Sequence, residues 1–77
     1  MDIDEDKVDE AALALLYLTI HDKFRAWKQI DFEVMNRLCE KGYILDPINK
    51  TKSVCLTNEG LETSEKLFEK FFKKNLD

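Results

Sequence analysis

The sequence predicts a small α+β domain, mostly helical, that occupies residues 1–77 as one unit. The chain has 77 residues, which is enough for one small domain and not for two. Three segments start with a residue that caps helices and continue with a helical spacing of apolar side chains. Two short β-type runs with turn residues between them precede the last of these segments. We therefore expect helix 4–22, helix 31–41, β-hairpin 43–57 and helix 58–74.

The first predicted helix begins at Asp4, which can cap it, and Glu5 and Asp6 then face the positive end of the helix dipole. Its apolar side chains lie on nearly all sides, which predicts burial on nearly all sides. One chain with three helices has little means of covering such a helix alone. We therefore expect a homodimer, with Leu13 and Tyr17 as candidate partner contacts.

The segment 23–30, "KFRAWKQI", is a basic connection between the first two helices. Its Trp27 lies between Arg25 and Lys28 and allows two interpretations. We favour the one in which Trp27 fills the gap between the helices, because tryptophan is highly buried on average. In the other, Trp27 is exposed and becomes a candidate partner contact, since tryptophan and arginine dominate interface energetics.

The second helix and the hairpin are predicted from their end signals. Asp31 is the expected cap of helix 31–41, and Gly42 stops it in a left-handed conformation. Tyr43–Leu45 and Ser53–Thr57 are short strand candidates, and the "DPIN" at 46–49 supplies turn chemistry between them.

The last helix is capped by Thr57, and its buried face includes Leu61 and Phe68. Phe71 and Phe72 lie near its end. We expect a core or dimer role for both, so they join the candidate partner contacts.

Two motifs connect the hairpin to a known arrangement. "EKGYI", followed by a hairpin and "LTNEG", resembles segments of PadR-like and MarR-like winged-helix regulators, over residues 31–72. The resemblance implies a reduced winged helix in which helix 31–41 and the wing 46–52 contact DNA. The candidate DNA contacts are Lys28, Arg37, Lys41, Lys50 and Lys52. Against this, residues 23–30 are too few for a full positioning helix, and Glu33 and Glu40 flank Arg37.

A second resemblance covers nearly the whole chain. "ALALLYLTIHD", "RAWK", "GYILDP" and "KSVCLTNEG" are similar to a family of small bacterial proteins known only as a domain of unknown function. This resemblance implies a bacterial, stand-alone domain and supplies no catalytic or ligand-binding residue.

Composition argues against several function classes. The net charge is −4, and the first ten residues hold six acids and one base, so the rest of the chain is close to neutral. One histidine, no glycine-rich phosphate loop and two cysteines without a C-x-x-C spacing predict no metal site, no cofactor and no catalytic residue. An acidic start without a secretory signal predicts a cytoplasmic protein with reduced cysteines.

These observations favour a non-catalytic protein-interaction or regulatory module that acts as a homodimer with an unidentified protein partner. The alternative is a DNA-binding transcriptional regulator that uses helix 31–41 and the 46–52 wing. No membrane association is expected.

Overall fold

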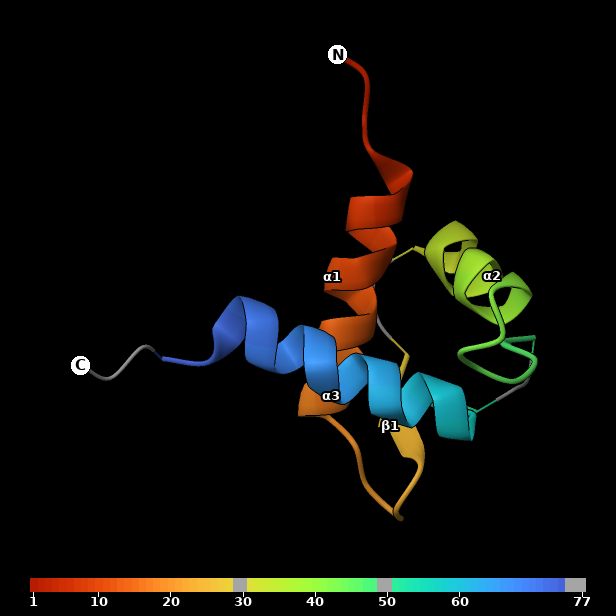
Figure 1. Cartoon of the computed structure of the whole chain (residues 1–77). Coiled ribbons are helices and arrows are strands. Elements are labelled where there is room, and N and C mark those ends of the chain that lie inside the picture. Colours follow the sequence, from red (N-terminus) through yellow and green to blue (C-terminus); the bar gives the residue numbers. More distant parts are fainter. Residues whose placement is uncertain (29–30, 49–50, 75–77) are drawn as a thin grey trace.

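The computed structural model describes residues 1–28, 31–48 and 51–74. Along the chain these form α1 (Glu5–Leu18), β1 (Arg25–Trp27), α2 (Phe32–Glu40), β2 (Ser53–Cys55) and α3 (Asn58–Phe72). The predicted order of helix, helix, hairpin and helix is confirmed, and so is the mostly helical α+β class (Figure 1).

All three helices begin where the sequence predicts. The side chains of Asp4, Asp31 and Thr57 accept hydrogen bonds from the backbone N–H groups of Lys7, Glu33 and Gly60, respectively. Each bond satisfies a donor that the first turn of a helix leaves without a partner.

The first helix ends earlier than predicted, at Leu18 instead of residue 22. Thr19 ends it, because its backbone N–H and its hydroxyl both donate to the Leu16 carbonyl, at 3.0 and 3.2 Å. The chain then turns back through Asp22 and Lys23, whose φ angles are 48° and 72°. Two consecutive positive φ angles are typical of a tight hairpin turn, and a bridge between His21 and Arg25 closes it.

The connection 23–30 contains a strand that the sequence did not reveal. β1 pairs antiparallel with β2, and Ala26 faces Val54 in the register. On the other side of β2, the predicted hairpin is present as a single bridge between Ile44 and Leu56. Ala26, Val54 and these two residues are buried, so the short sheet contributes one face to the core.

Hydrogen bonds join the segment that follows α2 to the start of α3, where the motifs "EKGYI" and "LTNEG" lie. Gly42 has a φ of +84° at the end of α2. Thr57 donates from its hydroxyl to the Gly42 carbonyl at 2.6 Å and from its N–H to the Tyr43 carbonyl at 3.0 Å. A Cβ at Gly60 would overlap the carbonyl oxygen of Tyr43, so the first turn of α3 requires glycine there. The motifs "EKGYI" and "LTNEG" are therefore explained by the contact between the hairpin and the first turn of α3.

The core surrounds α1, which packs against α3, α2 and β1 (Figure 1). Ala14 of α1 and Ser64 of α3 are fully buried, and such small residues let two helices approach closely. Leu13 is 1% exposed and lies in the main hydrophobic cluster. The interpretation of Leu13 as a partner contact is therefore wrong, because its own chain buries it. The three neighbours cover most of the apolar side chains of α1, and Leu18 at its end stays exposed.

Candidate interaction surfaces

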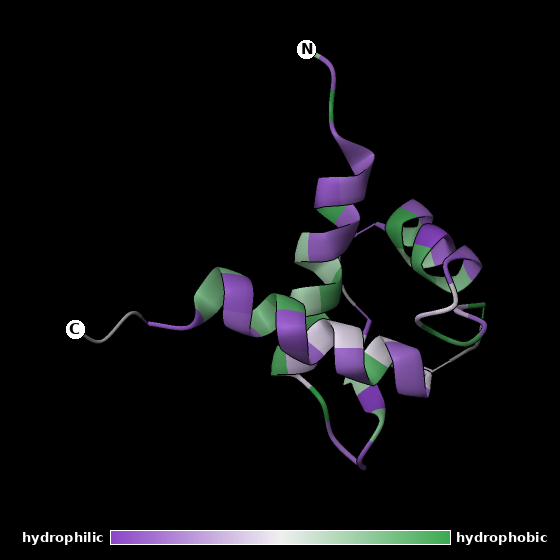
Figure 2. Cartoon of the chain, in the orientation of Figure 1, coloured by the Kyte–Doolittle hydropathy of each residue, from purple (hydrophilic) through white to green (hydrophobic). Residues whose placement is uncertain are grey.

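An aromatic cluster joins the two helices: Tyr17 comes from α1, and Phe68, Phe71 and Phe72 come from the last two turns of α3. The ring centroids of Tyr17 and Phe68 are 5.2 Å apart, those of Phe68 and Phe72 5.4 Å, and those of Phe71 and Phe72 6.1 Å. Phe71 and Phe72 are 44% and 48% exposed. This end of α3 reaches past α1 (Figure 1) and is partly apolar (Figure 2). Three of the predicted partner contacts are thus brought together.

Charge is divided along α3. Residues 58–65 contain three glutamates and no lysine, whereas residues 66–74 contain four lysines and one glutamate. Lys70 also places its Nζ 5.5 Å from the centre of the Phe71 ring, a cation–π distance. The aromatic cluster therefore lies in the basic half of a helix whose other half is acidic.

The fifth predicted partner contact, Trp27, lies elsewhere and is 51% exposed. Its ring stacks on His21 with centroids 4.5 Å apart and 28° between the planes. The favoured interpretation, in which Trp27 fills the gap between the first two helices, is wrong. The strand alternates, so Ala26 points into the core and its neighbours Arg25 and Trp27 point outward.

The predicted DNA contacts of α2 are engaged with acids of α1. Arg37 donates from Nε and Nη2 to the Asp9 carboxylate at 2.8–3.0 Å, and from Nη1 to Glu5 at 3.1 Å. Lys41 donates to Asp9 at 2.9 Å and to Asp6 at 3.1 Å. Asp9 itself is 1% exposed. Neither cation of α2 is therefore available to phosphates without giving up its partners on α1.

This ion-pair group shifts the pKa values of its members. Burial alone would raise the pKa of Asp9, but hydrogen bonds from Arg37 and Lys41, and their charges, outweigh burial and lower it. The hydrogen bond to Asp9, with a smaller contribution from Asp6, raises the pKa of Lys41. The hydrogen bond to Asp9 likewise raises the pKa of Arg37.

Sequence reasoning missed Asp9. One signal could have found it: an acid at a position that continues the apolar face of Ala12, Leu13 and Leu16. An acid on a buried face requires cations nearby.

The remaining DNA candidates lie apart from α2. The Lys28 N–H donates to the Lys52 carbonyl at 2.8 Å, which places these two residues side by side at one end of the sheet. Lys50 lies outside the described residues. The four candidates that lie within the described residues therefore do not form the single surface that the resemblance implied.

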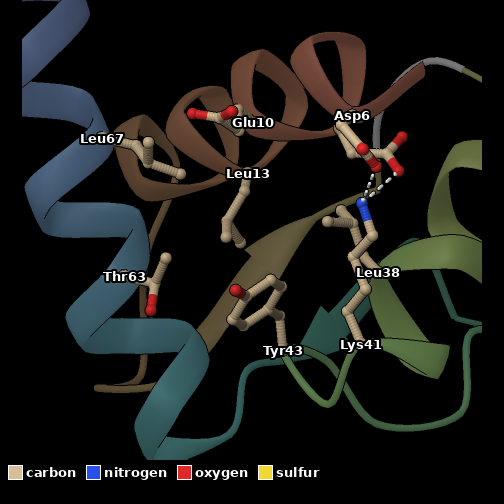
Figure 3. A pocket seen from close by; sticks show the side chains of 9 residues that line it. Asp6, Glu10, Leu13, Leu38, Lys41, Tyr43, Thr63 and Leu67 are labelled. Atoms are coloured by element: carbon tan, nitrogen blue, oxygen red, sulfur yellow. Dashed lines mark hydrogen bonds and ion pairs between the residues drawn. The ribbon is translucent and has the colours of Figure 1, made fainter. Parts of the chain in front are cut away.

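A pocket of about 430 Å³ lies between the three helices (Figure 3). Leu13, Leu38 and Leu67 give it apolar walls, and Lys41 reaches across its edge to Asp6 and Asp9. The Lys41 ammonium is thus occupied by protein carboxylates. Over residues 1–28, 31–48 and 51–74, no cluster of His, Cys, Asp and Glu could hold a metal ion. In the same ranges no helix is long and apolar enough to cross a membrane.

The fold and these surfaces define a small α+β domain in which α2, α3 and a short antiparallel sheet pack around α1. The chain belongs to the family described as domain of unknown function DUF6429, which matches residues 4–74. It is similar to the uncharacterized protein y4hR of Sinorhizobium fredii (strain NBRC 101917 / NGR234), with 54% identity over 74 residues. These residues are 96% of this chain and 100% of y4hR. The predicted bacterial family of unknown function is confirmed, and no solved structure matches the chain significantly.

Proposed function

We propose that this protein is a non-catalytic protein-interaction module that acts as a homodimer through α3. The observation that carries the proposal is the aromatic cluster, in which Phe71 and Phe72 leave about half of their surface in water. The core of so small a domain supplies only about 3–5 kcal/mol. Covering two phenylalanines would add stability that a single chain lacks.

The charge division of α3 supports a second copy as the occupant of this surface. A two-fold axis perpendicular to α3 near its midpoint would set two α3 helices antiparallel, and a symmetric interface would then use the same helix face twice. The acidic half of each helix would then face the basic half of the other. Such complementarity fixes the register and excludes the parallel arrangement.

A DNA-binding regulator that uses α2 and the 46–52 loop is less well supported. The ion pairs of Arg37 and Lys41 with α1 would have to break before these cations reached phosphates. Breaking a buried pair leaves an uncompensated charge at Asp9, which is costly.

The dimer is tested by light scattering coupled to size exclusion at micromolar concentration. We expect twice the chain mass of 9.1 kDa for the wild-type protein, and the single-chain mass for Phe71→Ser combined with Phe72→Ser. Phe32→Ser is the matched control, because Phe32 is exposed on α2 and lies outside the cluster. A wild-type protein with the mass of a single chain would refute the proposal.

A further inference from the structure

One face of β1 presents three planar side chains that the proposed dimer does not use. The bridge between His21 and Arg25 puts their side chains on the same side of the hairpin. Trp27, two residues further along the strand, points to the same side as Arg25 and stacks on His21. We call His21, Arg25 and Trp27 the β1 face. An imidazole, a guanidinium and an indole are thus gathered on one exposed surface.

The surroundings of the β1 face are basic, unlike the chain as a whole. Residues 19–28 and 51–57, which form the hairpin and the paired strand, contain three lysines, one arginine and a single acid, Asp22. The whole chain, in contrast, carries a net charge of −4. Much of that acidity lies on the first turns of α1, where Glu5, Asp6 and Asp9 are paired with cations of α2. The local charge of the β1 face is therefore positive.

The cations near the β1 face flank the planar groups. Arg25 lies within the face, and Lys23 occupies the turn that precedes it. Lys28 and Lys52 pair one position beyond Trp27 and Ser53, so strand alternation turns their side chains to the opposite face, with Ala26 and Val54. Lys23 and Arg25 are therefore the cations that accompany the rings of His21 and Trp27.

We propose that the β1 face binds single-stranded nucleic acid. Proteins that bind single strands combine a positive track for the phosphates with aromatic side chains on which the bases stack. The β1 face supplies both, and the guanidinium of Arg25 is itself a stacking surface. An acidic peptide would satisfy the cations but would leave the indole without a flat partner. In a duplex the bases are already stacked on one another, so the exposed rings favour an unpaired strand.

The chain offers a built-in reporter, because Trp27 is its one tryptophan. A 12-nucleotide oligothymidylate, titrated at 50 mM salt, should quench the fluorescence of Trp27 as a base stacks on the indole. The logarithm of the binding constant should fall with the logarithm of salt concentration, by roughly 0.7 for each phosphate that a cation neutralises. Absence of quenching and of binding at 50 mM salt would overturn the proposal.

Substitutions separate stacking from charge, with binding followed by the anisotropy of a labelled oligothymidylate. Trp27→Ala should weaken binding roughly 5- to 150-fold, the effect of losing one stacked base, and Trp27→Phe should restore part of it. Arg25→Gln with Lys23→Gln should weaken binding and flatten the salt dependence. Lys66→Gln with Lys70→Gln is the charge-matched control on α3 and should change little. Unchanged affinity in Trp27→Ala would contradict the stacking.

Two further measurements distinguish a single strand from anions in general, and the β1 face from the α3 surface. A short polyglutamate that quenches Trp27 as strongly as the oligonucleotide, at equal charge, would show a general anion surface and refute the proposal. The Phe71→Ser and Phe72→Ser variant should keep its affinity for oligothymidylate, and Trp27→Ala should keep the mass of the wild-type protein. The β1 face and the dimer are thereby tested independently.

Discussion

Arg37 of α2 and Asp9 of α1 form a two-pronged ion pair although they are 28 residues apart, with Nη2–Oδ1 and Nε–Oδ2 distances of 2.8 and 2.9 Å. This geometry matches a guanidinium to a carboxylate edge to edge and is the strongest form of such a pair. It fixes α2 against the N-terminal half of α1, where Lys41 and the core side chains add further links. The charged residues of α2 thus hold the fold together.

Asp9→Asn should therefore destabilise the fold. The amide keeps the shape but loses the charge that Arg37 and Lys41 contact, and hydrogen bonds to charged groups contribute about 1.5–3 kcal/mol each. We expect the free energy of unfolding in urea to fall by roughly 1–3 kcal/mol. Glu10→Gln is the control, because Glu10 lies next in the chain and makes none of these bonds. Equal stability of both variants would contradict the role given to Asp9.

Lowering the pH should remove the stabilisation that the ion pairs of Asp9 give to the fold. The pKa of Asp9 is lower in the folded chain than its ordinary value of 3.8, so the unfolded chain takes up a proton first as pH falls. The stabilisation is then fully present above about pH 4 and is lost as pH falls below that value towards the folded pKa. Urea unfolding of wild type and Asp9→Asn at pH 7 and pH 3 should show a difference that shrinks in acid. A difference of the same size at both pH values would be inconsistent with this account.

The local signals of this sequence predicted the ends of elements well. Asp4, Asp31 and Thr57 cap the three helices as expected, because capping depends on a side chain and the N–H groups two or three residues ahead. Gly42 ends α2 for a similarly local reason. For Phe71 and Phe72 the sequence left a core role and a dimer role open, and the structure leaves both rings 44–48% exposed.

The features that the sequence did not predict depend on contacts between residues far apart in the chain. β1 is three residues long and is defined by pairing with Ser53–Cys55, which no pattern within 23–30 reveals. The early end of α1 depends partly on the hydrogen bond from Trp27 N–H to the Thr19 hydroxyl, at 3.1 Å. The ion pair of Arg37 was expected from its own helix and instead crosses to α1. Tertiary contacts, and not the local sequence pattern, thus determine the position of β1, the end of α1 and the partner of Arg37.

Gly60→Ala should be destabilising, against the usual trend. In an open helical position this change stabilises by about 0.5–1 kcal/mol. Here the new methyl would overlap the Tyr43 carbonyl, and overpacking costs about 1–3 kcal/mol. Gly42→Ala is an informative comparison, because that Cβ would meet nothing within 4 Å and only the φ of +84° opposes it. A more stable Gly60→Ala variant would show that the hairpin does not approach α3 so closely.

If the dimer is antiparallel, reversing the charge of one half of α3 should prevent self-association. Mixing two variants with opposite reversals should restore the dimer. In one variant Glu62 and Glu65 become lysine, so both halves of α3 are basic. In the other Lys70 and Lys73 become glutamate, so both halves are acidic. Each variant alone sets like charges opposite one another across the two-fold axis, and each should run as a monomer at micromolar concentration. Mixed together, the basic helix of one faces the acidic helix of the other, and the mass should double.

The effect depends on four charges in one interface, because a single exposed pair contributes only about 0.2–1 kcal/mol. Salt at 1 M reduces the Debye length to about 3 Å and should therefore let each variant self-associate more readily while weakening the preference for the mixture. Phe71 and Phe72 stay in place in both variants, so the apolar contact is unchanged and the comparison isolates the register. A mixture that remains monomeric while wild type is dimeric would exclude the antiparallel α3 pair and direct attention to a different arrangement of the two copies.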